Sequence, residues 1–393
     1  MALTDTTGRI FLAWLIAAPV LGLAPHELAV VANRSSSDSL HVANAYCAMR
    51  GIPQHNLVLV SPPPGSLQPE ARITPADFTR TIWEPVNDAL DRRGIDATIR
   101  AWVYSVDMPL RVSTAPEISI QGITLVRNEL PPQEQVKKGS YLSPFFAGPS
   151  QPGGGRRPTV SLDAWRPEDA PLPSMMLGHT GARGTTVGKV LAGLRRGIAA
   201  DHTFPTGTVY FVETDDVRGK ARNWQVDDAI SELAELGVGG VSTTNFPRGD
   251  LTVLGIMIGS KQLNPFQKYT VLPGAFAENL TSFGGRFEHE NQTKLTRWLE
   301  AGFTGSTGTV TEPYALWTKF PHARFHVHYA RGATLMDSLY QSVFCPLQRL
   351  MVGEPLTRPF APRIEVDLAV SGMPDGSYRL RAVPDATNAG EGP

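Results

Sequence analysis

The alternation of strand-like and helix-like segments is the feature that most constrains the fold of this chain. Residues 27–33, ELAVVAN, form a short valine-rich apolar run that is typical of a buried strand. The serines of SSSDS can cap the helix that follows, and NLVLV at residues 56–60 is typical of the next strand. Because strand–helix–strand order is the pattern of βαβ units, the sequence predicts a parallel sheet.

The same order returns after a segment rich in proline and glycine. Apolar positions at helical spacing predict helices at residues 186–199 and 224–237, with a buried strand at 207–216 between them. Further strands are expected at residues 239–243, 253–258, 269–272, 306–310 and 348–352, and further helices at 292–301 and 334–344. The predicted fold class is α/β, with two consecutive Rossmann-like parallel-sheet halves.

The predicted division of the chain follows these changes in pattern. Alternating residues around a Pro-Asp-Gly turn indicate a β-hairpin near the C-terminus, and the last residues are expected to be disordered. The expected parts are a signal peptide at residues 1–24, an N-terminal α/β subdomain at 25–130, a Pro/Gly-rich insertion at 131–173, a second α/β subdomain at 174–362, and a hairpin with a disordered tail at 363–393.

The N-terminus indicates export. Arg9 precedes an apolar run over residues 10–24 that is too short for a spanning helix and fits the core of a signal peptide. Asp5 and Pro25 weaken this interpretation, and a buried first helix is the alternative. We expect an exported protein, periplasmic or secreted. No second apolar run in the sequence is long enough to span a bilayer.

Charge and composition narrow the possible partners and cofactors. The formal net charge of -1 and the absence of a long Lys/Arg run argue against a nucleic-acid partner. Two cysteines, Cys47 and Cys345, exclude a disulfide framework and allow at most one bridge. The stretch GARGTTVGKV at residues 181–190 lacks the spacing of a P-loop. We expect no cofactor.

Candidate ligand-binding residues lie where predicted strands end, because ligands of parallel sheets bind beyond the carboxyl ends of strands. Asp215 and Asp216 follow one strand, but acids at such positions more often cap the next helix. Thr270–Leu272 is expected to be a buried central strand, with Gly274 to Ser282 as the floor of a crevice and Glu312 alongside. The predicted substrate-binding residues are Gly274, Asn279, Ser282 and Glu312.

A serine nucleophile is the enzymatic alternative. Ser282 precedes Phe283-Gly284-Gly285, whose amides could stabilise an oxyanion, and His179 or a strand-end carboxylate could act as base. However, LTSFGG is not a G-x-S-x-G elbow, so a hydroxyl that caps a turn is the stronger interpretation of Ser282.

Histidines near the C-terminal end allow a metal site in principle. His326 and His328 are at strand spacing, with His322 nearby, so the pair could face one side of a strand. No further ligand stands at a recognisable spacing. We therefore favour hydrogen-bonded structural histidines and predict no metal.

Several long motifs resemble an uncharacterised bacterial family found in genomes that carry the exosortase sorting system. They are ELAVVANRSSSDSLHVANAYCAMRGIP, the segment from MMLGHTGARGTT to ETDDVR, LPGAFAENLTSFGG, and the segment from AGFTGSTGTVTEP to LTRPF. The later half also resembles the caspase-like fold of gingipain-type cysteine peptidases. That resemblance implies a histidine and a cysteine after two central strands. Here the first ends in Gly259-Ser260, and Ala277 and Asn279 stand where some relatives carry Cys and His.

These observations lead to one leading hypothesis about function. We expect an exported caspase-like protein without cysteine-peptidase activity that binds a polypeptide or a cell-envelope component. A hydrolase that uses Ser282 and a structural envelope protein are the alternatives.

Overall fold

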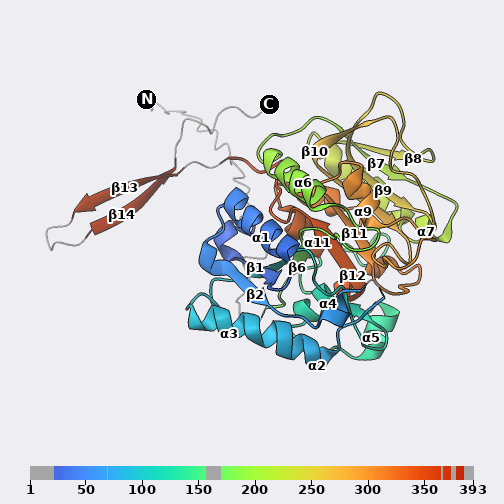
Figure 1. The fold of residues 1–393 in the computed structure, drawn as a ribbon. Helices are drawn as coiled ribbons and strands as arrows, with labels where there is room; N and C mark the ends of the chain where they lie inside the picture. Colours follow the sequence, from blue (N-terminus) through green and yellow to red (C-terminus); the bar gives the residue numbers. More distant parts are fainter. Residues whose placement is uncertain (1–21, 69, 156–169, 364–365, 373–377, 385–393) are drawn as a thin grey trace, which may run out of the picture.

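The structure is a computed structural model that describes residues 22–68, 70–155, 170–363, 366–372 and 378–384 (Figure 1). The expected signal peptide at residues 1–24 and the expected tail fall almost entirely outside this part of the chain. Among the described residues, no helix combines the length and the apolar character needed to cross a membrane.

A single sheet of ten strands forms the centre of the molecule. The predicted α/β class is confirmed, with helices flanking this sheet (Figure 1). In spatial order, the strands are β2 (Leu57–Val60), β1 (Leu28–Asn33), β3 (Ala101–Tyr104), β6 (Ser174–Met176), β12 (Arg349–Gly353), β11 (Gly305–Thr309), β10 (Thr270–Leu280), β9 (Thr252–Gly259), β7 (Thr208–Val212) and β8 (Gly239–Thr243).

The sheet consists of two blocks of strands that run in opposite directions. All neighbouring strands are parallel except β11 and β12, which pair antiparallel with Ser306 opposite Val352. The carboxyl ends of β7 to β11 therefore lie at one end of the sheet, and those of β1, β2, β3, β6 and β12 lie at the other. The two predicted series of strands thus join edge to edge in one sheet, because β6 pairs with β3 on one side and with β12 on the other.

Helices cover both faces of this sheet, as expected for a mostly parallel arrangement. Helix α1 begins after the N-cap Ser36, whose hydroxyl accepts from Ser39 N, and ends at Gly51 in a left-handed conformation. It packs against α6 (Figure 1). The helices are α1 (Ser37–Arg50), α2 (Pro75–Phe78), α3 (Glu84–Arg92), α4 (Ile120–Leu125), α5 (Gln133–Lys138), α6 (Val187–Ala199), α7 (Val217–Lys220), α8 (Val226–Glu235), α9 (Leu295–Glu300), α10 (Phe325–Ala330) and α11 (Leu335–Ser342).

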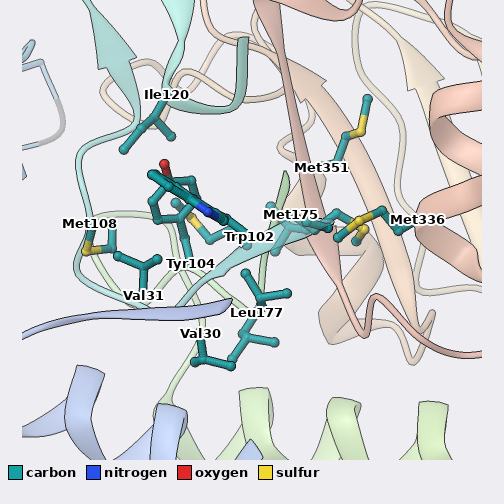
Figure 2. Close-up of a cluster of buried hydrophobic side chains, with 14 of the residues drawn as sticks. Val30, Val31, Trp102, Tyr104, Met108, Ile120, Met175, Leu177, Met336 and Met351 are labelled. Atoms are coloured by element: carbon teal, nitrogen blue, oxygen red, sulfur yellow. The ribbon is translucent and has the colours of Figure 1, made fainter. Parts of the chain in front are cut away.

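The apolar core runs across the junction of the two blocks. Figure 2 shows Trp102 of β3 in one cluster of buried apolar side chains with methionines from three separate segments: Met175 of β6, Met336 of α11 and Met351 of β12. All four side chains are buried. Methionine is flexible enough to fill irregular gaps, so it suits a core where elements from distant parts of the chain meet.

The proline-rich segment is less irregular than the sequence predicts. It contains α5, and the rings of Phe145 and Phe146 are buried. Ser143 N donates to Phe344 O over 2.8 Å, which holds the segment against the chain after α11. Residues 156–169 lie outside the described part.

Strand β10 is longer than predicted. It continues through Pro273 and Gly274 to Leu280, with a register shift against β9 between Val271 and Phe276. Gly274 has a φ of +84°, a left-handed value that favours glycine. Residues 270–272 are exposed or half-buried, and the buried part of the strand begins at Gly274.

Near the C-terminus, one prediction is wrong and one is confirmed. His326 and His328 lie in helix α10, not in a strand, so their spacing does not put them on one side of a strand. The predicted hairpin is present as β13 (Val366–Gly372) paired antiparallel with β14 (Tyr378–Pro384).

Candidate functional site

The carboxyl ends of β10 and β11 bring Ser282 and Glu312 together, as predicted. Ser282 Oγ donates to Glu312 Oε1 over 3.2 Å, and the same carboxylate oxygen accepts from Tyr314 N at 2.8 Å. The contact arises because α9 connects two neighbouring parallel strands, so their ends lie side by side. Glu312 and Tyr314 are exposed, which leaves this cluster open to a ligand.

Gly274 does not belong to this cluster. It lies six residues before the end of β10 and is buried. Its N–H donates to Thr304 Oγ1 over 3.0 Å, and its carbonyl accepts from Tyr329 Oη over 2.9 Å. A Cβ at this position would lie 2.6 Å from Pro359. The prediction that Gly274 lines the crevice is wrong, because the strand continues past the Pro-Gly pair.

Asn279 holds the end of β9 in place. Its Oδ1 accepts from Ser260 N and its Nδ2 donates to Ser260 O, both over 2.9 Å. The side chain is 3% exposed. The caspase-like resemblance implies a histidine and a cysteine at the ends of β9 and β10. Here the Asn279 side chain instead makes two hydrogen bonds to the backbone of Ser260.

The backbone around Ser282 offers little to a tetrahedral oxyanion. Phe283 N donates to Gln292 Oε1 over 2.7 Å, and Gly285 N donates to Thr309 O over 3.0 Å. Two of the three amides considered as oxyanion donors are thus already engaged. An oxyanion hole needs free donors aimed at the reacting oxygen, so this geometry disfavours acyl transfer.

His179 has its contacts elsewhere. Its ring stacks on Phe287, with 3.9 Å between centroids, and its Nε2 lies 3.3 Å from Ala182 O. Burial lowers the pKa of His179 to about 4. A base with such a low pKa is poorly matched to activation of a serine near neutral pH.

The two cysteines are free and buried, and neither directly follows β9 or β10 in the chain. Cys47 lies within α1, and Cys345 follows α11. Burial raises the pKa of each thiol to about 11. A reactive cysteine needs its thiolate form, which such an environment disfavours.

A pocket of about 460 Å³ adjoins the Ser282 cluster. It is joined to the cluster by Gln292, which accepts from Thr281 Oγ1 over 2.6 Å, and by Lys294, whose Nζ donates to Phe283 O over 2.8 Å. The lining residues are Arg183, Gly184, Gln262, Leu263, Glu290, Gln292, Thr293, Lys294, Arg297 and Glu300. The sequence analysis missed this pocket because its residues come from three separate loops and α9.

Of the two acids after β7, Asp216 caps the next helix, as acids at such positions commonly do. Asp216 is the N-cap of α7 and accepts from Arg218 N over 2.9 Å. Asp215 is fully exposed and lies 3.5 Å from Lys220 Nζ. Neither lines the pocket.

The histidines of the α10 region are buried, as favoured. Burial lowers the pKa of His322 and of His326 to about 3, and it also lowers that of His328. Over the described residues, no group of three or more His, Cys, Asp or Glu side chains is arranged to hold a metal ion.

Comparison of the chain with protein-family models, with curated proteins and with solved structures found no match.

Proposed function

We propose that this chain is an exported polypeptide-binding protein with a caspase-like α/β fold and no cysteine-peptidase activity. One observation carries the proposal. The carboxyl ends of β9 to β11 hold an open pocket beside an exposed Ser282–Glu312 pair, at the position where parallel sheets bind ligands. The surroundings supply groups for binding but no activated nucleophile.

A polypeptide suits this surface chemically. Glu312 and Ser282 offer hydrogen-bonding groups for a backbone or a polar side chain, and Tyr314 is 56% exposed beside them. Tyrosine is enriched in binding surfaces because its ring supplies contact area at a small cost in conformational entropy. The pocket behind the pair has a volume within the usual range for ligand sites.

Binding to an array of extended peptides, measured for the full chain, for two test variants and for one control variant, tests the proposal. Tyr314→Ala and Glu312→Gln should each lower the affinity for the peptides that the parent protein binds by about tenfold, or about 1.4 kcal/mol. Asp215→Asn is the matched control, because it removes an exposed acid at the same end of the sheet. Equal binding by all three variants would contradict the proposal.

A covalent serine probe separates this proposal from the hydrolase alternative. We expect no labelling of Ser282, because two of the three amides that follow it are engaged and His179 is stacked on Phe287. Stoichiometric labelling at Ser282 would overturn the binding-only interpretation.

Export is the second part of the proposal. It rests on Arg9 and the apolar run at residues 10–24. N-terminal sequencing of protein from its native host should find a start between residues 20 and 30, and a start at Met1 or Ala2 would contradict export.

A further inference from the structure

The pocket beside Ser282 is distinguished by its charges. Three cationic side chains line it, and two of them have carboxylate partners in the same lining. Arg183 pairs with Glu290 and Arg297 pairs with Glu300, each over 2.7 Å. The third cation is Lys294.

Lys294 has no carboxylate within ion-pair distance in the described part of the chain. Its residue is 4% exposed, and the contact of its Nζ is the hydrogen bond to Phe283 O. A lysine ammonium has three donors, so two remain for a ligand. Burial without a counter-ion raises the free energy of the charged ammonium. A bound anion would lower that free energy again.

The pKa of Lys294 agrees with this geometry. Burial lowers it to about 8, while nearby Glu288 opposes the shift. At neutral pH the side chain therefore remains mostly protonated and can bind an anion.

Gln292 supplies a second, oriented group. Its Oε1 accepts from both Thr281 Oγ1 and Phe283 N, which fixes the direction of the amide. The other end of that amide, Nε2, carries only donors. An anion with two oxygens could thus be met by an ammonium and an amide N–H from neighbouring positions on one loop.

We propose that this pocket binds a carboxylate group of the polypeptide ligand, with Lys294 as its counter-ion and Gln292 as a hydrogen-bond donor. The inference rests on the proposed polypeptide-binding function. The carboxylate could come from an acidic side chain or from a chain end, since both present the same two oxygens. The volume of about 460 Å³ accepts either.

Titration of the full chain with small probes tests the chemistry of the pocket directly. The Lys294 resonance is followed by NMR while N-acetylglutamate amide supplies a side-chain acid, N-acetylglycine supplies a chain-end acid, and N-acetylglutamine amide supplies neither. We expect the acids, but not the neutral amide, to shift the resonance and to raise the pKa of Lys294. The acid that binds more tightly identifies the source. Equal shifts with the neutral probe would overturn the inference.

Three variants extend the test to peptides from the array. Lys294→Met keeps the apolar stem and should weaken acid-dependent binding by at least about tenfold. Lys294→Arg should retain part of it. Lys189→Met is the control, since Lys189 pairs with Glu300 but does not line the pocket. The acid-against-amide comparison on the parent protein remains decisive if Lys294→Met fails to fold.

The two proposals fail in different ways. Peptides that bind equally with acids and with their amides would overturn the carboxylate inference and leave polypeptide binding intact. Small acids that bind while no peptide does would overturn the polypeptide proposal.

Discussion

The parts of the chain before and after residue 179 differ in what they bury. In the described part of residues 22–178, Arg111 is the one Asp, Glu, Lys, Arg or His side chain that is buried. From residue 179 onward, the buried set comprises His179, Arg222, Glu232, Glu278, Lys294, Lys319, His322, Arg324, His326, His328, Asp337, Arg349 and Glu354. Buried charge is costly unless it is paired, so the two parts obtain their stability differently.

The difference also separates scaffold from site. The early part buries almost entirely apolar side chains, such as Trp102 and Met175, which share one core cluster with Met336 and Met351 of the late part, as Figure 2 shows. The late part supplies the pocket, Lys294 and the Ser282–Glu312 pair. Stability that depends on neutral histidines and paired charges responds to pH and to single charge changes, whereas apolar packing does not. Four experiments examine this contrast.

Acid should produce the largest effect. An unfolded histidine has a pKa of about 6.5. Burial holds His322 and His326 near a pKa of about 3 and lowers the pKa of His328. Between about pH 3 and about pH 6.5 the unfolded state therefore binds more protons, so stability is complete above this window and is lost as the pH falls. The slope should approach about 1.4 kcal/mol per pH unit for each histidine.

Urea unfolding from about pH 7 to about pH 5 measures this slope. His326→Leu should reduce it by roughly one third of the three-histidine effect. His41→Gln, at an exposed position of α1, should leave it unchanged. Equal unfolding free energies of the parent protein at the two pH values would show that these histidines do not control its stability in acid.

Removal of one buried charge should come next. Glu278 in β10 forms ion pairs with Arg222 and Arg349, and all three are buried. Glu278→Gln leaves two guanidinium groups without their carboxylate and should cost about 3–5 kcal/mol of unfolding free energy. The exposed Glu312→Gln should change it by less than about 0.5 kcal/mol. Similar denaturant midpoints for the two variants would contradict the argument.

Truncation of the apolar core should cost somewhat less. Met175→Ala removes a fully buried side chain from the same core cluster as Trp102 and should lower the unfolding free energy by about 2–5 kcal/mol. Because no charge is lost, this difference from the parent should be equal at about pH 7 and about pH 5. A cost that grows with acidity would erase the proposed distinction between the two parts.

Changes at the cysteines should have the smallest effect. With the pKa of each thiol raised to about 11 by burial, iodoacetamide should label the native protein far more slowly than the unfolded chain. Cys47→Ser and Cys345→Ser should leave peptide binding intact and shift stability by about 1 kcal/mol. Loss of peptide binding after alkylation of either thiol would instead indicate a function that depends on that cysteine.

The sequence predicted much of the fold because local patterns were clear. Helix α6 at Val187–Ala199 and strand β1 at Leu28–Asn33 follow their apolar spacing closely. Two signals were misleading. Pro273-Gly274 usually breaks a strand, but here a register shift absorbs it. The histidines of α10 alternate like strand residues, yet the helix is buried on nearly all sides and so lacks a clear period.

The site could be predicted only in part. Ser282 and Glu312 were found because each follows a strand, and neighbouring strands end together. The pocket was missed because Arg183, Gln262 and Lys294 are brought together by the path of loops, which no local pattern encodes. In the sequence, Lys294 is marked only by its place directly before the residues of α9. That position does not show whether the lysine is buried or exposed to solvent.

The glycines beside the Ser282 cluster restrict how this protein can change over evolution. A Cβ at Gly308 of β11 would lie 2.4 Å from the backbone of Gly284, and one at Gly285 would lie 2.9 Å from Gly308 O. These contacts involve backbone atoms, which cannot move aside as a flexible side chain can. The loop after β10 and strand β11 are therefore expected to covary. New specificity would then arise by substitution at the rim, around Glu312 and Tyr314, and not by remodelling of the loop.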